Sequence, residues 1–409
     1  MHRPASARLA IAAALLLVVA CAGDSDDGGG ASTTAAPATI TTSTTSTSVA
    51  PNGEATATTP PRPDGSVPDD GNRYTPGRAD VLADARSVDL PGVPVRVIGV
   101  DGVGPGFVVV LDDGTVVGVD VAVSPGQVDL GRGDVAIERT ADGSVTVTAP
   151  LLPIEIDDPL PDAAVTTSAD GRIAVLAGPT DRYPHAILGD DLEAARLVII
   201  GGRNEVVIEA PSPAVFEGRR PTWADLDGDG EPEVLATVAG GGAGARIAAF
   251  DPDTGAQVAT TTALGQERRW RHRIAVAPTG PDGAIELVEV RTPHIGGIVS
   301  FRAVDDGELL LTGEERGWSS HAIFDTELDN AHVLDADGDG RPELLIPSQE
   351  RDELGLLRRV EDRVEVVARV SLGGKLAAGL GIAATPDDRI AVAVGLADER
   401  LLVWDAPPS

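Results

Sequence analysis

The chain has 409 residues, in which 64 Asp and Glu outnumber 32 Lys and Arg and give a formal net charge of −32 at pH 7. Such a field repels phosphate backbones and anionic lipid head groups, so it argues against nucleic acid as a partner and leaves divalent cations and neutral glycans. A single cysteine, Cys21, excludes an intramolecular disulfide. Lys375 is the one lysine, and together with the abundance of Ala, Gly, Val and Asp it indicates a GC-rich, actinobacterial source.

Residues 1–20 predict an export signal. Arg3 and Arg8 precede the aliphatic run Leu9–Ala20, which is too short to span a bilayer but typical of a signal peptide. The run ends in Leu17-Val-Val-Ala-Cys21, which resembles a bacterial lipobox, and the resemblance implies that Cys21 is lipidated and becomes the first residue of the mature protein. The alternative is a secretory signal that merely contains a cysteine. We expect anchorage to the outer face of the cytoplasmic membrane through this lipid alone.

Residues 21–80 differ in composition from the rest of the chain. Ser, Thr, Ala, Pro and Gly dominate, as in Thr41-Thr-Ser-Thr-Thr-Ser-Thr47, and apolar runs are absent. Such a segment cannot bury enough surface to offset its conformational entropy, so a disordered tether is predicted, with a root-mean-square reach of roughly 40 Å. The folded part is expected over residues 81–409.

Turn signals between apolar runs predict two hairpins after the tether. Phe107–Leu111 and Thr115–Val121 flank an Asp-Asp-Gly turn, and Val135–Arg139 and Ser144–Thr148 flank an Ala-Asp-Gly turn. Helical periodicity is nearly absent, so the chain is predicted to be all-β.

Two nine-residue loops carry the most specific chemistry of the chain. Each has carboxylates at positions 1, 3, 5 and 9 and glycine at positions 4 and 6, and position 7 is expected to offer its backbone carbonyl. Hard cations such as Ca²⁺ take six to eight oxygen ligands, and glycine allows the backbone to approach the ion. The predicted ligand positions are Asp225, Asp227, Asp229, Glu231 and Glu233 in one loop and Asp335, Asp337, Asp339, Arg341 and Glu343 in the other.

Two alternatives compete with a calcium loop at these positions. An EF-hand needs its bidentate Glu at position 12 and flanking helices, whereas here the acid comes at position 9 and short apolar runs follow. The other alternative is a solvated acidic turn without an ion. Two copies in the same register favour the metal.

Weaker copies of the loop predict a repeat. Position 9 falls at residues 174, 233, 286, 343 and 391, with steps of 59, 53, 57 and 48 residues. The copy at Asp282 and Glu286 keeps positions 5, 6 and 9 and is expected to bind Ca²⁺ weakly, whereas the loops at Asp170 and Asp387 are expected to hold none. A period near 50 residues of strand and turn predicts propeller blades of four strands. In one unit, strands are expected over Leu344–Pro347, Gly355–Val360 and Val364–Val370.

The loop followed by an apolar strand resembles the FG-GAP/VCBS-type repeat of integrin-like β-propellers over roughly residues 160–409. The resemblance implies one β-propeller with calcium loops inside its blades and favours surface, adhesion and ligand-binding roles. Dividing the length by the repeat predicts six four-stranded blades, or seven if residues 95–160 hold two. We expect a strand near Val95–Val100 to complete the short last blade.

Residues that could serve a ligand face or catalysis are fewer. The sequence has no Gly-x-Ser-x-Gly elbow, His-Glu-x-x-His or phosphate-binding loop. His294, His332, Trp223 and Trp270 are candidates for a ligand face, with turn stabilisation and packing between blades as the alternatives. The arginines around Trp270 predict either an anion site or a solvated edge strand: Arg268, Arg269, Arg271 and Arg273.

Three functional classes follow from these observations. The leading hypothesis is a monomeric, non-catalytic, Ca²⁺-stabilised cell-surface propeller that binds an envelope protein or glycan. The second is a hydrolase or lyase acting on an envelope polysaccharide, and the third is a structural or assembly lipoprotein. No catalytic residue is predicted.

Overall fold

The computed structural model describes a set of segments that all belong to the unit Ala38–Ser409. The described residues are 40–43, 69–102, 104–124, 136–139, 144–148, 156–201, 205–325 and 327–406. Cys21, the signal peptide and most of the expected tether lie outside them. Within the described segments the secondary structure is β-strand apart from the short 3₁₀ turn Pro281–Gly283, which confirms the all-β prediction. None of these segments forms a helix with the length and apolar content needed to cross a bilayer.

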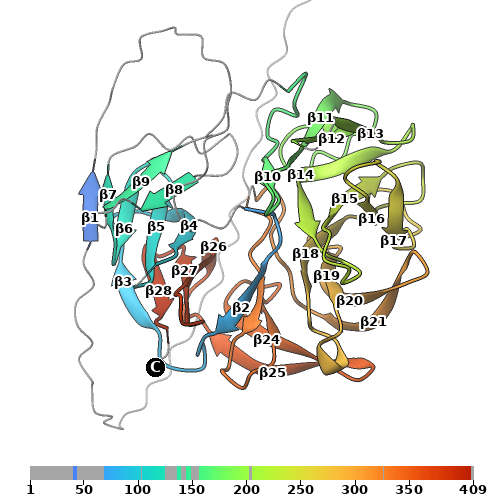
Figure 1. The fold of residues 1–409 in the computed structure, drawn as a ribbon. Coiled ribbons are helices and arrows are strands. Elements are labelled where there is room, and N and C mark those ends of the chain that lie inside the picture. Colours follow the sequence, from blue (N-terminus) through green and yellow to red (C-terminus); the bar gives the residue numbers. More distant parts are fainter. Residues whose placement is uncertain are drawn as a thin grey trace, which may run out of the picture. The chain divides into compact units, whose positions relative to one another are not determined.

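Antiparallel meanders of four strands follow one another along the chain (Figure 1). Single residue pairs, Ala194 with Phe216 and Thr260 with Glu308, join neighbouring meanders. The strands are β10 (Thr166–Thr167), β11 (Ile173–Thr180), β12 (Glu193–Ile200) and β13 (Val206–Glu209), then β14 (Val215–Ala224), β15 (Glu233–Ala239), β16 (Arg246–Phe250) and β17 (Gln257–Thr260), then β18 (Arg271–Ala277), β19 (Glu286–Arg291), β20 (Ile298–Asp305) and β21 (Glu308–Arg316), then β22 (His332–Asp335), β23 (Glu343–Pro347), β24 (Glu353–Val360) and β25 (Arg363–Ser371).

Burial within a meander explains the sequence patterns. The second strands β15 and β23 are buried throughout, which is why they read as continuous apolar runs, whereas the outer strand β25 alternates between exposed and buried residues. The three strands expected in the unit after Asp335 are confirmed as β23, β24 and β25. Successive four-stranded meanders of this kind are the building units of a β-propeller.

The last meander is completed by an N-terminal strand, but a different one from that expected. Strands β26 (Leu376–Ala384), β27 (Ile390–Leu396) and β28 (Arg400–Trp404) continue into β3 (Arg86–Asp89), which pairs with β28. The strand expected near Val95–Val100 is present as β4 (Pro94–Val100), but its expected role in completing the last meander was wrong, because it pairs with β5. An outer strand needs few apolar residues, and Val88 is the one buried side chain of β3, so the sequence signal there is weak.

The two N-terminal hairpins are confirmed. Strands β4, β5 (Gly106–Leu111) and β6 (Val116–Val119) form an antiparallel meander, and β1 (Ile40–Ser43) pairs with β6. Strand β9 (Ser144–Thr148) pairs with β8 (Ala136–Arg139) and, in parallel, with β7 (Ala122–Ser124).

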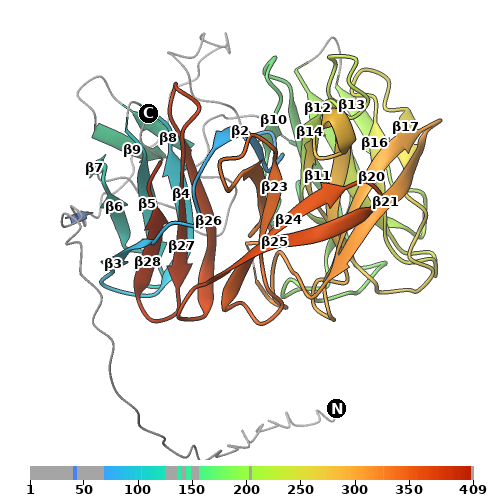
Figure 2. The same ribbon diagram turned by 90° about the horizontal axis from the view of Figure 1, so that it is seen from below.

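The tether was expected to extend to residue 80. In the structure, residues 69–81 instead bind strands of the folded part. Strand β2 (Tyr74–Arg78) lies parallel to β22, and both ribbon views place it between β26 and the β22–β25 meander (Figures 1 and 2). Backbone hydrogen bonds connect this segment to the first strands of four meanders, including Thr167 N to Asp69 O, Trp223 N to Asp70 O, Arg73 N to Ile274 O and Val333 N to Arg73 O. The segment was missed because it binds through its backbone and has no apolar run.

Candidate functional site

The aspartates at positions 1, 3 and 5 of the two acidic loops come together in the structure. The loops connect β14 to β15 and β22 to β23, so they occupy the same place in two meanders. In each loop one carboxylate oxygen from every Asp lies within 4.8 Å of the others. The triplets are Asp225, Asp227 and Asp229, and Asp335, Asp337 and Asp339.

Backbone amides hold the first aspartate of each loop. Gly228 N and Gly230 N donate to the two oxygens of Asp225 over 2.7 and 3.0 Å, and Gly340 N donates to Asp335 over 2.9 Å. Gly228 and Gly230 have φ of 79° and 92°, a region that L side chains rarely adopt, so the loop requires glycine at these positions.

The glutamates at position 9 lie outside the two triplets. Glu233 accepts from Leu226 N over 2.8 Å and Glu343 accepts from Ala336 N over 3.0 Å, so each closes its loop from the buried side. Burial raises the pKa of both carboxyls to about 7. The side chains at position 7, which are those of Glu231 and Arg341, are exposed.

The donor set of each triplet suits a hard cation. Calcium and magnesium prefer carboxylate oxygens, and three carboxylates this close repel one another without a positive charge. In the second loop Asp335 Oδ1 is buried and has no hydrogen-bond partner among the described residues.

The third loop does not assemble as a weak metal site. Glu286 is buried and accepts from Arg359 Nε over 3.2 Å and from Thr312 Oγ1 over 2.6 Å, while Asp282 is exposed on the 3₁₀ turn. Among the described residues only the two Asp triplets gather as metal ligands.

The other degenerate copies use arginine. Asp170 lies 2.8 Å from Arg172 Nε, and Asp387 lies 2.7 Å from Arg389 Nε. Both arginines stand at position 7 of their loops. A guanidinium therefore supplies the positive charge where the aspartate triplet has been lost.

The four residues expected on a ligand face lie in three places. Trp270 and His294 come together, with ring centroids 5.6 Å apart. Trp223 packs in the core near Arg172, and His332 Nε2 lies 2.8 Å from Thr75 Oγ1 of β2. The structure shows Trp223 packed in the core, which was the alternative hypothesis for this residue.

An aromatic cluster forms around Trp270 and His294 with two histidines that the sequence did not single out. The His321 ring lies 4.9 Å from Trp270, 4.8 Å from His294 and 5.3 Å from His272 between centroids. Nitrogens Trp270 Nε1, His294 Nε2 and His321 Nε2 are buried without hydrogen-bond partners among the described residues. Burial lowers the pKa of His294 to about 4 and that of His321 well below its usual value. The His294 and His321 rings are therefore neutral at pH 7.

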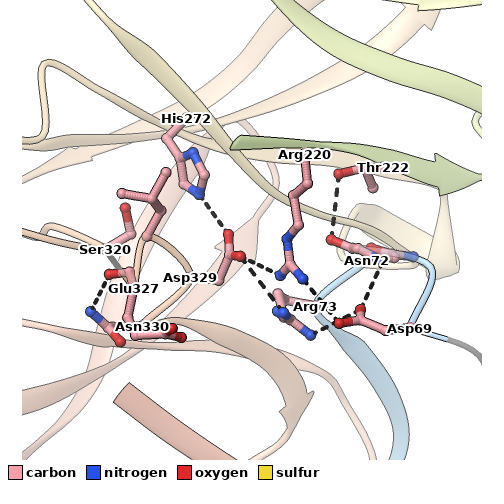
Figure 3. A network of polar contacts seen from close by, with 12 residues as sticks. Asp69, Asn72, Arg73, Arg220, Thr222, His272, Ser320, Glu327, Asp329 and Asn330 are labelled. Atoms are coloured by element: carbon pink, nitrogen blue, oxygen red, sulfur yellow. Dashed lines mark hydrogen bonds and ion pairs between the residues drawn. The ribbon is translucent and has the colours of Figure 1, made fainter. Parts of the chain in front are cut away.

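Beside this cluster an ion-pair network converges on Asp329 (Figure 3). His272 Nε2 lies 2.6 Å from its carboxylate, Arg220 binds it directly, and Arg73 lies 3.6 Å away. Burial alone would raise the pKa of Asp329, but His272 and the nearby arginines outweigh it and hold the pKa well below its usual range. The network connects the N-terminal segment to β14, β18 and the loop before β22.

The arginines after Trp270 do not form the expected basic patch or solvated edge strand. Arg271 and Arg273 are buried in β18, where Arg271 pairs with Glu289 over 3.3 Å and Arg273 Nε donates to Thr222 Oγ1 over 2.9 Å. Both guanidinium groups lie inside the fold, Arg271 in an ion pair and Arg273 in hydrogen bonds to neutral oxygens, so neither is exposed to an anion in solution.

A pair of buried glutamates lies at the junction of β12 and β14. Glu217 contacts His185, and Glu193 stands on the neighbouring strand. Burial raises the pKa of Glu217 to about 8, and Glu193 shifts in the same direction. The two residues are only 3% and 9% exposed, so a polysaccharide does not reach them in this structure.

Acid is expected to destabilise the fold through His332. Burial, reinforced by Arg73, lowers the pKa of His332 to about 3, whereas the unfolded chain takes up the proton near pH 6.5. Its contribution is therefore complete above pH 6.5 and is lost as the pH falls from 6.5 toward 3. At pH 5 this amounts to about 2 kcal/mol. Urea unfolding of the wild type and His332→Gln at pH 7 and pH 5 measures it; an equal pH dependence in both proteins would contradict the assignment.

Comparisons with known proteins give no family. No protein-family model matches the chain, and no curated protein matches it. Among solved structures, BBS1N in complex with ARL6DN is 12% identical over 80% of this chain and 97% of that one, with a TM-score of 0.42. The Dos1 propeller is 8% identical over 80% and 96%, with a TM-score of 0.40. The soluble aldose sugar dehydrogenase from Escherichia coli is 11% identical over 80% and 100%, with a TM-score of 0.39. Likeness at this level carries no argument about function.

Proposed function

We propose that the chain is an exported, lipid-anchored β-propeller that is stabilised by Ca²⁺ and binds an envelope protein or glycan without catalysis. Each four-stranded meander is a blade, six in all, and β3 closes the ring. The observation that carries the proposal is the recurrence of an aspartate triplet at the same place in two meanders. The run Leu17-Val-Val-Ala-Cys21, which resembles a lipobox, supports the proposed export and anchorage.

The metal's role in this proposal is structural. An ion bound by the triplet cross-links the turn between two strands and neutralises its carboxylates. The unfolded loop has no preformed site, so the binding free energy adds to folding. Modest calcium affinity is sufficient outside the cell.

Calcium is therefore expected to raise the unfolding temperature of the exported chain, residues 21–409. At one hundred times the dissociation constant the stabilisation is about 2.7 kcal/mol, which corresponds to several degrees. Thermal unfolding in millimolar Ca²⁺ and in excess EDTA measures it. Asp227→Asn should remove most of the shift, and Asp282→Asn, in a loop without a triplet, should leave it unchanged. Equal shifts in the wild type and Asp227→Asn would contradict the assignment of the first loop.

Binding without catalysis is tested on isolated cell-envelope polysaccharide and envelope protein. Calcium-loaded chain should be retained by one of them, and retention should fall in EDTA. Release of new reducing ends or unsaturated sugars would support the hydrolase or lyase alternative instead. No retention on either material would contradict the binding role.

A further inference from the structure

The two acidic loops are alike in sequence, but they differ in the residue of the neighbouring strand that lies opposite the glutamate at position 9. Pairing of Leu344 with Leu357 places Arg358 of β24 opposite Glu343. Arg358 Nη2 lies 3.1 Å from Asp337 Oδ2 and 3.0 Å from Asp339 Oδ2, and Nε donates to Glu343 over 2.6 Å. The arginine is 8% exposed, so its charge is enclosed by the loop.

The loop 225–233 has no such cation. Pairing of Val234 with Phe250 places Asp251 where the other loop has Arg358. Asp251 accepts from the backbone amides of Asp253 and Thr254, so its carboxylate serves its own turn. In the part of the chain that the structure describes, no arginine or lysine pairs with the triplet of this loop or with Glu233.

The oxygens of the two triplets are consequently not equally available. Asp337 Oδ1 accepts from Asp339 N and its Oδ2 faces Arg358, so both of its oxygens are occupied. The same holds for Asp339, whose Oδ1 accepts from Arg341 N. A calcium ion bound to these oxygens would lie next to the guanidinium of Arg358, which already contacts them. The two positive charges would repel each other.

We infer that Arg358 is the built-in cation of the loop 335–343 and takes the place of a metal ion there. The chain then binds one calcium ion, at the loop 225–233, rather than one at each loop. Arg172 and Arg389 also pair with an aspartate of a degenerate loop, each from position 7 of its own loop. The inference rests on the proposed calcium site of the loop 225–233.

The test compares four variants of the exported chain by calcium titration calorimetry and thermal unfolding. We expect one ion per wild-type chain, no ion in Asp227→Asn and still one in Asp337→Asn. Arg358→Gln should unfold at a lower temperature in EDTA, bind two ions and show a larger calcium-induced shift. Arg369→Gln is the matched control, because Arg369 is exposed on β25 and pairs with Glu353.

The outcomes separate the inference from the proposed function. Two ions in the wild type, or equal loss of the calcium shift in Asp227→Asn and Asp337→Asn, would overturn the inference and leave calcium binding standing. No calcium binding by the wild type would overturn the calcium function. The role of Arg358 would then be decided by Arg358→Gln alone. Binding of an ion by this variant would support the role of Arg358, and absence of binding would overturn it. Asp337→Asn keeps Arg358, so the test does not depend on how well Arg358→Gln folds.

Discussion

A chain that begins at residue 82 is expected to unfold at a much lower denaturant concentration than one that begins at residue 69. Residues 69–81 bind the first strands of several meanders, and Ala79 N and Val81 N donate to the backbone at Asp335 and Ala336. Each such hydrogen bond contributes about 1 kcal/mol net. Without the segment, β22 also has an open edge. We expect a loss of roughly 5 kcal/mol or more.

Urea unfolding of residues 69–409 and 82–409 measures this loss. A point variant tests the same contact in the longer chain: a Cβ on Gly71, at φ 75°, would stand 2.6 Å from Pro221 O, so Gly71→Val should expel the segment. Gly104→Ala is its control, because a Cβ there meets no atom within 4 Å. Equal midpoints for the two chains would show that the segment is not part of the folding unit.

Truncation after Glu399 is expected to destabilise the whole domain. It removes β28, which pairs with β27 on one side and β3 on the other, so two strand edges become exposed. It also removes Leu401 and Val403, which are 0% and 1% exposed in a core shared with Phe107 of the N-terminal meander. The loss therefore spreads beyond the last meander.

Leu401→Ala measures the same contact without truncation. Removal of a fully buried Leu side chain costs about 2–5 kcal/mol, whereas Leu82→Ala, at a side chain that is 52% exposed, should cost less than about 0.5 kcal/mol. Thermal unfolding of the truncated chain and both variants is the measurement. A truncated chain that melts like the parent would contradict closure of the fold by β3 and β28.

Local patterns predicted the parts of the fold that depend on neighbouring residues. The Asp triplets, the hairpin turn before Thr115 and the buried run Leu344–Pro347 are set by alternation and turn chemistry within about ten residues. The choice of β3 over β4 as the closing strand was not predictable in this way. This choice depends on which side chains become buried in the assembled fold, and an outer strand such as β3 needs only a single apolar residue.

The candidate site was predicted only in part, because several of its contacts join residues that are far apart in the sequence. His272 and His321 have no motif: His272 lies on β18 two residues after Trp270, His294 lies between β19 and β20, and His321 lies between β21 and β22, so the fold alone brings the four rings together. Arg358 stands 15 positions after Glu343 and reaches the loop only through the register of β23 and β24. Such contacts follow from strand pairing, which spacing in the sequence does not specify.

Titration of Ca²⁺ into residues 21–409, after treatment with EDTA and dialysis, measures whether the acidic loops bind the ion. We expect saturable binding that is abolished by Asp227→Asn, because the free triplet at Asp225, Asp227 and Asp229 provides the oxygens. Absence of binding at millimolar Ca²⁺, with the chain folded, would contradict this expectation.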